Sequence, residues 1–386
     1  MKKKITFVVN SRANYARIKS VISESLKSPG LDVRVVVGAS AVLYNYGNVS
    51  EIMEDDGIPV HARLYNVVEG NKPISMAKTT GLAINDLAQE FLNSKPDLVI
   101  TVADRFETIA TAVAASYMNI AVAHTQGGEL TGSIDENVRH SITKLSHFHF
   151  PATLGAVQVL RQLGEEPKRI FHVGCPSIDL VKQSKPLEIN QTMEKYSGVG
   201  EALNFSDPFI LVSQHPDTLK YMNSRDQIYQ TLQAITKSGM QAIWLWPNMD
   251  AGSDSISKLL REYRETKSSM PIHFYRNFSA EDYINVLKNA SCIVGNSSSG
   301  IREASFIGLP CVNIGPRQNG RERTENVIDV NYNKDDILAA IKLQINHGKY
   351  TPSFIYGDGN SGMRMTSILE NIDTSDIEKK FIRLFK

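Results

Sequence analysis

The stretch PDLVITVAD, residues 96–104, carries the pattern on which the fold class depends. It is a short apolar run, rich in β-branched side chains, and it ends abruptly at an aspartate. A strand with one solvated face alternates apolar and polar residues, whereas a continuous apolar run is typical of a strand buried on both faces. The run is therefore expected to form a central strand of a parallel sheet.

Similar runs recur along the chain, separated by longer amphipathic stretches such as residues 283–290 and 335–345. The other strand candidates are residues 4–10, 32–38, 120–125, 169–175, 208–214, 241–247, 272–278, 291–297 and 310–315. Strands that alternate with helices predict the α/β class, in which helices cover both faces of a parallel sheet.

The two series of strands lie on either side of a polar, glycine-containing stretch at residues 183–206. A chain of 386 residues is also too long for one ordinary core. We therefore predict two doubly wound domains facing each other across a cleft, at residues 1–182 and 183–364. A C-terminal helix at about residues 365–386 is expected to pack back on the first domain.

The composition excludes several classes of protein. Hydrophobic residues make up 42% of the chain and charged residues 22%, as in soluble globular proteins. A formal net charge of +1 provides no basic field for nucleic acid or an anionic membrane. The apolar run near the N-terminus is interrupted at Asn10, too early for a signal peptide, and no run approaches the roughly 20 apolar residues of a membrane helix. A cytoplasmic protein is expected.

The three cysteines, Cys175, Cys292 and Cys311, lie far apart beside strand candidates. Their spacing matches neither a metal site nor a disulfide framework. We expect reduced thiols in the core.

Polar stretches follow strand after strand. Because ligands of open α/β sheets bind beyond the carboxyl ends of the strands, these stretches are the candidate site. They are residues 10–17, 103–108, 124–140, 213–217, 246–250, 295–303 and 315–323. Seven such stretches predict a large cleft lined for a polar ligand.

The stretch GNSSSGIREAS, residues 295–305, has the form of a strand end, a turn of small residues and a helix that starts near Ile301. Free N–H groups at such a turn bind anions, so phosphate is the expected ligand. Arg317 and Arg321 follow one strand later and suit a pyrophosphate. A plain serine-capped turn is the alternative. The chain has no Walker motif, and no GxGxxG follows its first strand, which disfavours triphosphatases and NAD enzymes.

The other polar stretches contain residues with two interpretations each. Asp104 and Asp135 are candidate acids, but each also stands where an aspartate caps a helix. Arg139 lies four residues after Asp135, so the two could form a solvated pair on a helix surface. His215 is a candidate ligand or a surface histidine, and the histidines at 140, 147 and 149 lack zinc spacing.

Taken together, these motifs resemble those of the hydrolysing UDP-N-acetylglucosamine 2-epimerases. The resemblance rests on DRFET, HTQGGELTGSIDENVRHSITKLSH, HVGCPSIDL, PNMDAGS and GNSSSGIRE…GPRQNGRER, in this order along nearly the whole chain. The family includes bacterial enzymes of the sialic acid pathway and the epimerase half of the bifunctional animal enzyme. It implies two Rossmann-like domains in a GT-B-like arrangement, with a nucleotide sugar between them.

The resemblance also implies the reaction. The C2 proton of UDP-N-acetylglucosamine is removed and UDP leaves, and water adds to the resulting 2-acetamidoglucal to give N-acetylmannosamine, for sialic acid or surface polysaccharide precursors. Asp104 and Asp135 match the two catalytic aspartates. The implied UDP-sugar ligands are Arg12, Arg17, Arg105, His215, Asn248, Ser297, Ser298, Glu303 and Arg317. No metal or redox cofactor is implied, and a homodimer or homotetramer is expected.

The chain departs from the family at Gln126. The animal enzyme's motif reads His-Ile-Glu-Gly-Gly-Glu, whereas residues 124–129 read HTQGGE, so a catalytic carboxylate becomes an amide. An amide cannot carry a proton at neutral pH, although it can hydrogen-bond to the sugar or to water. Three alternatives therefore stay open: an epimerase for the UDP-linked 2,4-diacetamido-2,4,6-trideoxy sugar of the legionaminic acid route, a GT-B glycosyltransferase, and a non-catalytic UDP-sugar sensor.

Overall fold

The computed structural model describes residues 2–44, 48–70, 72–185, 187–217, 222–247, 252–266 and 271–383. The chain divides into two compact units, which are described separately. The first unit comprises Met1–Leu130, Ile134–Lys182 and Ile355–Lys386, and the second comprises Thr131–Ser133 and Gln183–Phe354. The chain thus returns to the first unit at Ile355, ten residues before the predicted position.

The first unit is built on a six-stranded sheet, counted over the described residues, with the order β3-β2-β1-β4-β5-β6. All its pairings are parallel. The strands are β1 (Lys3–Val9), β2 (Leu31–Gly38), β3 (Ala62–Leu64), β4 (Leu98–Val102), β5 (Ala121–Thr125) and β6 (Phe148–Phe150). The order reverses between β1 and β4, which is the switch point of a Rossmann-like sheet. The buried strand β4 is central, as predicted from its apolar run.

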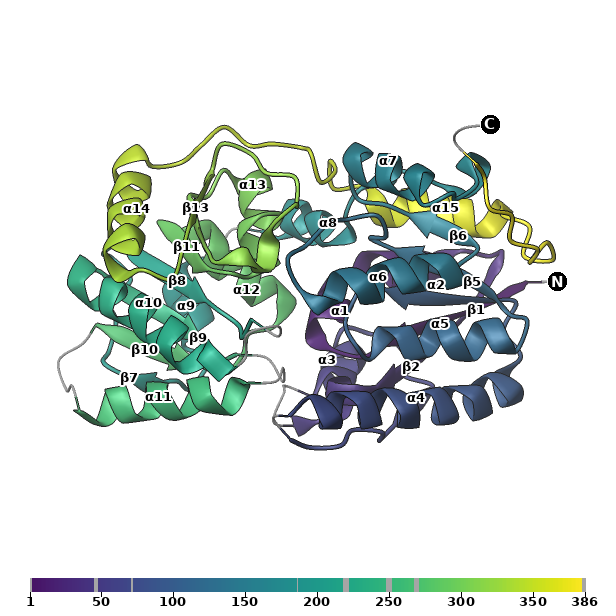
Figure 1. The fold of residues 1–386 in the computed structure, drawn as a ribbon, viewed down its shortest axis with the longest axis horizontal. Helices are drawn as coiled ribbons and strands as arrows, with labels where there is room; N and C mark the ends of the chain where they lie inside the picture. The colour runs from purple at the N-terminus through teal and green to yellow at the C-terminus, as the bar shows by residue number, and fades with distance from the viewer. Residues whose placement is uncertain are drawn as a thin grey trace. The chain divides into compact units, whose positions relative to one another are not determined.

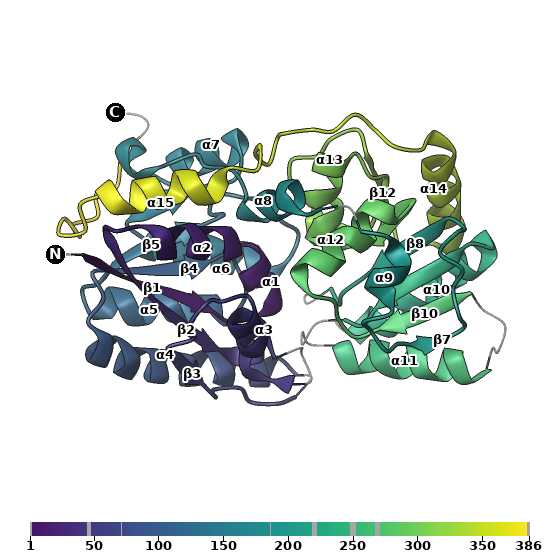
Figure 2. The same ribbon diagram turned by 180° about the vertical axis from the view of Figure 1, so that it is seen from behind.

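Helices cover both faces of this sheet, as Figures 1 and 2 show. Alternate strand residues point to opposite faces, so Val8 and Val99 pack under α4, α5 and α6, while Phe7 and Ile100 pack under α2 and α15. The helices are α1 (Arg12–Ala16), α2 (Lys19–Lys27), α3 (Val49–Asp55), α4 (Pro73–Ser94), α5 (Thr108–Tyr117), α6 (Ile134–Leu145), α7 (Leu154–Gln162), α8 (Pro176–Gln183) and α15 (Ser361–Asn371).

The second unit repeats this plan. Its described strands form a seven-stranded sheet with the order β13-β12-β11-β8-β9-β10-β7. Counted from β8, the parallel strands follow the same order as in the first sheet, with the switch point between β8 and β11. The strands are β7 (Val199–Gly200), β8 (Phe209–Ser213), β9 (Gln241–Leu245), β10 (Ile272–Tyr275), β11 (Cys292–Gly295), β12 (Cys311–Ile314) and β13 (Val327–Val330). Only β7 is antiparallel among them, at the edge.

The second sheet is also covered on both faces. Leu211 and Ile243 pack toward α9, α12 and α13, whereas Val212 and Trp244 pack toward α10, α11 and α14. The helices are α9 (Ile189–Met193), α10 (Ser224–Ser238), α11 (Ser253–Thr266), α12 (Ala280–Asn289), α13 (Glu303–Ile307) and α14 (Lys334–His347). Two Rossmann-like units, the components of a GT-B-like fold, confirm the predicted fold class.

Two predicted elements differ from the structure, and one stretch contains a helix that was not predicted. Residues 169–175 form no strand: they make one isolated bridge, between His149 and Ile170, and the chain turns at Gly174, whose φ is +89°. The stretch 183–206, which separates the two series of strands, contains α9, whose Ile189 and Met193 are buried in the core of the second unit. The C-terminal helix begins and ends earlier than predicted, at Ser361 and Asn371.

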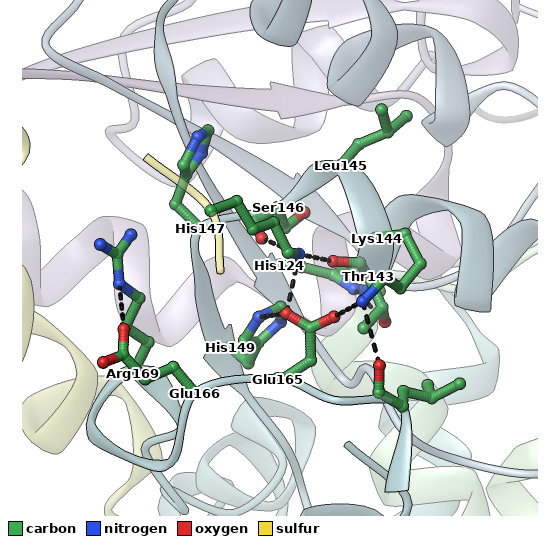
Figure 3. Close-up of polar contacts among 12 residues, drawn as sticks. His124, Thr143, Lys144, Leu145, Ser146, His147, His149, Glu165, Glu166 and Arg169 are labelled. Atoms are coloured by element: carbon green, nitrogen blue, oxygen red, sulfur yellow. Dashed lines mark hydrogen bonds and ion pairs between the residues drawn. The ribbon is translucent and has the colours of Figure 1, made fainter. Parts of the chain in front are cut away.

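Beyond α15, residues 372–383 form the C-terminal segment, which lies on the first unit without regular secondary structure. Its Lys379 donates to Glu165, whose side chain is only 2% exposed (Nζ–Oε2 2.7 Å). Glu165 also accepts from Lys144 at 2.7 Å and contacts His149 Nε2 at 2.9 Å (Figure 3). Burial would raise the pKa of Glu165, but His149 and the two lysines outweigh burial and lower the pKa to about 2.

Two further expectations concern the chain as a whole. Cys175, Cys292 and Cys311 are free and buried, as predicted for core thiols. Within the described part of the chain, no helix combines the length and the apolarity needed to cross a membrane.

Candidate active site

Asp104 lies at the switch point of the first unit, just beyond β4. The chain leaves the strand through Ala103, whose φ of +65° is left-handed, and this turn brings the buried Asp104 against α6. There Arg139 donates from Nη2 to the carboxylate of Asp104. Arg17, at the end of α1, lies on the other side, with its Nη1 3.9 Å from Asp104 Oδ1.

Arg139 interacts with both candidate acids, Asp104 and Asp135. Its side chain is 0% exposed and also donates to the backbone oxygen of Glu129 at 2.6 Å. Burial would lower the pKa of Arg139, but the charges of Asp104, Glu129 and Asp135 outweigh burial, so this pKa is raised. The structure therefore rules out the alternative of a solvated surface pair of Asp135 and Arg139, because α6 turns Arg139 into the protein. One buried cation faces three carboxylates.

Helix α1 presents two of the predicted arginines. Ser11 caps the helix by accepting from the backbone N–H of Asn14, and the Asn14 amide donates to the oxygen of Val102 at the end of β4 (3.2 Å). This anchor holds half-buried Arg12 and Arg17 at the first and last turns of α1, close to the end of β4.

Arg105 follows Asp104 but points to a different partner. Its Nε donates to the buried Glu107 at 2.7 Å. This ion pair holds the guanidinium of a residue that directly follows the candidate acid Asp104.

Gln126 follows β5 in a left-handed conformation, with a φ of +61°. Its side chain is 1% exposed, and its Nε2 lies 3.4 Å from the sulfur of Cys175. Its Oε1 has no hydrogen-bond partner among the described residues. A buried carbonyl oxygen left in this state is an acceptor for a ligand or a water molecule.

The two glycines after Gln126 serve packing within the first unit. A Cβ at Gly127 would lie 2.9 Å from Nδ1 of His124, and one at Gly128 would lie 2.3 Å from the oxygen of Ala156 on α7. Both positions therefore require glycine, because the protein's own atoms occupy the space that a Cβ would take.

In the second unit, Asn296 connects three strand ends. It follows β11 and is 0% exposed. Its Oδ1 accepts from the backbone N–H of His215 (2.7 Å), which follows β8. Its backbone oxygen accepts from Arg317 (3.3 Å) and Gln318 (2.8 Å), which follow β12. Asn296 thus gathers His215 and Arg317 at the switch point of the second sheet.

The serine turn lies directly after Asn296. A Cβ at Gly295 would be 2.1 Å from the oxygen of Ser213, so only glycine fits where the strand ends. Ser297 and Ser298 are half-buried at a 3₁₀ turn, Ser298–Gly300. The helix was predicted to start at Ile301, but α13 starts at Glu303 and has five residues. This turn can bind an anion through its backbone N–H groups and serine hydroxyls, but it has no long helix whose dipole would add to binding.

Glu303 is the buried acidic residue that follows the serine turn. It occupies the first turn of α13, and its Oε2 has no hydrogen-bond partner among the described residues. A carboxylate oxygen in this state is suited to accept from hydroxyl groups. Asn248, the remaining predicted ligand, lies outside the described residues. Among the described residues, no group of three or more His, Cys, Asp and Glu side chains is arranged to hold a metal ion.

Each unit therefore carries a polar group at the switch point of a Rossmann-like sheet, which is where enzymes of this architecture bind nucleotides. Comparison with known proteins agrees with this class. The model of the UDP-N-acetylglucosamine 2-epimerase family matches residues 24–370. The chain belongs to this family, whose members are enzymes of nucleotide-sugar metabolism.

Individual relatives cover nearly the full length. The chain is 33% identical to the UDP-N,N'-diacetylbacillosamine 2-epimerase (hydrolyzing) of Legionella pneumophila, over 96% of this chain and 97% of that one. It is 29% identical to the UDP-N-acetylglucosamine 2-epimerase of Neisseria meningitidis, over 99% of both chains. The crystal structure of Methanocaldococcus jannaschii UDP-GlcNAc 2-epimerase in complex with UDP-GlcNAc and UDP shares the fold, with a TM-score of 0.79 at 20% identity over 95% of this chain and 99% of that one.

Proposed function

We propose that the chain is a hydrolysing UDP-N-acetylglucosamine 2-epimerase, which converts UDP-N-acetylglucosamine and water into N-acetylmannosamine and UDP for sialic acid or surface polysaccharide precursors. The observation that carries the proposal is the pair Asp104 and Asp135 around one buried cation, Arg139, at the switch point of the first sheet. Family membership supports the same chemistry.

The reaction needs a base for a weakly acidic C–H and a stabilised leaving group. In the first step a carboxylate takes the C2 proton, the bond between C1 and the UDP oxygen breaks, and a C1–C2 double bond forms. In the second step water adds its oxygen to C1 while C2 is protonated from the opposite face. Asp104 and Asp135 share these proton transfers, and Arg139 balances the negative charge that they carry. Gln126 hydrogen-bonds the sugar or the water through its unpaired Oε1.

The nucleotide is assigned to the second unit. Ser297, Ser298 and Arg317 bind the diphosphate, and Glu303 accepts from the ribose hydroxyls, consistent with its buried, unpaired Oε2. Arg12, Arg17 and Arg105 supply further positive charge for the diphosphate. His215 and Asn248 are assigned to the surroundings of the nucleotide.

The test is incubation of the protein with UDP-N-acetylglucosamine alone, in deuterated water, with product analysis by mass spectrometry and NMR. We expect free UDP, N-acetylmannosamine and one solvent deuterium at C2. UDP with N-acetylglucosamine would indicate simple hydrolysis, and UDP-N-acetylmannosamine would indicate a non-hydrolysing epimerase; either result rejects the proposal. Turnover without an acceptor also excludes the glycosyltransferase and sensor alternatives.

A second candidate substrate is UDP-N,N'-diacetylbacillosamine, the 2,4-diacetamido-2,4,6-trideoxy sugar. It is favoured by the 33% identity to the Legionella enzyme named for it and by the amide at Gln126 in place of the family's carboxylate. Steady-state kcat/KM values for both substrates, measured on one preparation, decide between them. A ratio above about tenfold, equivalent to 1.4 kcal/mol in transition-state binding, identifies the preferred sugar.

A further inference from the structure

His124 is fully buried on β5 and is hydrogen-bonded on both ring nitrogens. Its Nε2 lies 2.8 Å from the backbone oxygen of Ala103, and its Nδ1 lies 3.3 Å from Oγ1 of Thr143 on α6. Figure 3 shows His124 beside Thr143 of α6. A carbonyl oxygen only accepts, so Nε2 carries the proton, and Nδ1 is left to accept from the threonine hydroxyl. The contacts thus select one tautomer.

The surroundings also keep the ring neutral. Burial, helped by the nearby His149 and Arg139, lowers the pKa of His124 to about 3 against the opposing effects of the Ala103 carbonyl and Asp104. The ring therefore does not exchange a proton in the range where an enzyme works. Proton transfer is excluded as its role, and a fixed hydrogen bond remains.

The bond from His124 ends on a strained peptide. Ala103 is a non-glycine residue with a left-handed φ of +65°, and such conformations persist only where the surroundings hold them. Its N–H donates to the oxygen of Thr125 (3.3 Å) and its oxygen accepts from His124, so β5 holds the peptide groups on both sides of Ala103. The next residue is Asp104, whose direction depends on this turn.

We infer that His124 is a positioning residue: a neutral, single-tautomer imidazole that holds the turn at Ala103 and so keeps Asp104 on Arg139. The catalytic consequence rests on the role proposed for Asp104. The tautomer and the hydrogen bond do not depend on that role.

Two variants separate this role from simple core packing. In His124→Gln the amide nitrogen reaches the place of Nε2 and can still donate to Ala103. In His124→Asn the shorter side chain reaches only the place of Nδ1, so it keeps the contact with Thr143 and loses the one with Ala103. With UDP-N-acetylglucosamine we expect kcat to stay within about threefold for Gln and to fall by about tenfold or more for Asn, with KM nearly unchanged in both. Wild-type kcat in the Asn variant, or equal losses in both, would overturn the inference.

Wild-type protein provides a measurement that needs neither variant to fold. Long-range ¹H–¹⁵N NMR of histidine-labelled protein reports the tautomer and charge of each ring, and the His124 signals are assigned by their Overhauser contacts with Thr143. We expect an Nε2–H tautomer that does not titrate between pH 5 and 9. An Nδ1–H tautomer, or a titration in that range, contradicts the inference. If the wild type releases no product, the proposed function fails while this spectrum still decides the state of His124.

Discussion

At the scale of single residues, the buried charge of Arg139 shapes the chemistry of the first unit. A guanidinium is retained inside a protein only when carboxylates and carbonyl oxygens compensate for lost hydration. Asp104, Glu129 and Asp135 provide this compensation, so the residues proposed for catalysis also stabilise the cation. Catalysis and stability are therefore coupled at this point, and variants here need both an activity and a folding measurement.

Replacing either acid by its amide tests the proposed proton transfers. We expect Asp104→Asn and Asp135→Asn each to lower kcat by about 100-fold or more, the size of a lost general acid or base. The measurements are UDP release and deuterium incorporation at C2, together with melting curves that verify folding. Asp32→Asn, on an exposed position of β2, is the matched control and should behave as wild type. Full deuterium incorporation at wild-type rate by Asp104→Asn would refute its role.

Replacing Arg317 tests the diphosphate site. Arg317→Ala removes a charged donor, and we expect UDP to bind less tightly by about 1.5–3 kcal/mol, a loss of roughly 10- to 150-fold in affinity. Isothermal titration calorimetry with UDP measures this directly. The control is Arg225→Ala, an exposed arginine on α10 whose ion-pair partner is Glu262 on α11. Unchanged affinity in Arg317→Ala would show that UDP binds elsewhere.

At the scale of elements, the C-terminal segment is attached to the first unit by Lys379. Besides Glu165, its Nζ donates to the backbone oxygens of Thr143, in the last turn of α6, and of Ser146, just beyond the helix. Burial lowers the pKa of Lys379 to about 8, against the attraction of Glu165. The segment thus supports the helix that carries Asp135 in its first turn and Arg139 in its middle.

Removing this attachment should destabilise the first unit. Lys379→Met leaves Glu165 with fewer donors, and we expect a loss of about 1.5–3 kcal/mol in the free energy of unfolding, seen as a lower melting temperature by circular dichroism. Lys380→Met is the neighbouring control: Lys380 is exposed and lies 3.6 Å from the exposed Glu378, so its loss should be within about 0.5 kcal/mol. Equal melting temperatures for both variants would show that the Lys379 contacts add nothing.

At the scale of the whole molecule, buried titratable groups predict sensitivity to acid. Burial lowers the pKa of His147 to about 4 and that of His124 to about 3, below the ordinary value of 6.5. The folded state therefore binds fewer protons than the unfolded state below pH 6.5, so stability falls as pH drops from 6.5 toward 3. The lowered pKa of Glu165, about 2 against 4.5, adds a loss that begins near pH 4.5 and continues through pH 2.

Melting temperatures measured between pH 7.5 and 4 test this linkage. We expect a steady fall below pH 6.5 and a shallower fall in His147→Asn, whose amide oxygen can replace Nδ1 as acceptor for the N–H of Val122 without titrating. A wild-type melting temperature that is constant down to pH 5 would contradict the proposed burial of neutral histidines.

Local patterns predicted the elements that are buried on both faces. The apolar runs of β4, β5 and β8 identified buried strands because burial on both sides demands apolar residues at every position. The short strands β3, β6, β7 and β13 were not predicted. Each has only two to four residues, and the residues of β7 and β13 are exposed or only partly buried. Their pairing comes from neighbours across the sheet, which a local pattern does not record.

The sequence alone determined that two doubly wound sheets form, and which strand ends carry polar side chains, because both follow from residue order. Only the tertiary structure decided which of these side chains meet. The spacing of Asp135 and Arg139 allowed a surface ion pair, yet the packing of α6 against β4 and β5 turns Arg139 inward onto Asp104. Asn296 was one small residue in a serine-rich turn, yet it connects three strand ends. Helical and strand periodicity specify which face of an element is buried, whereas the partner on that face comes from a segment distant in sequence, and only packing brings the two together.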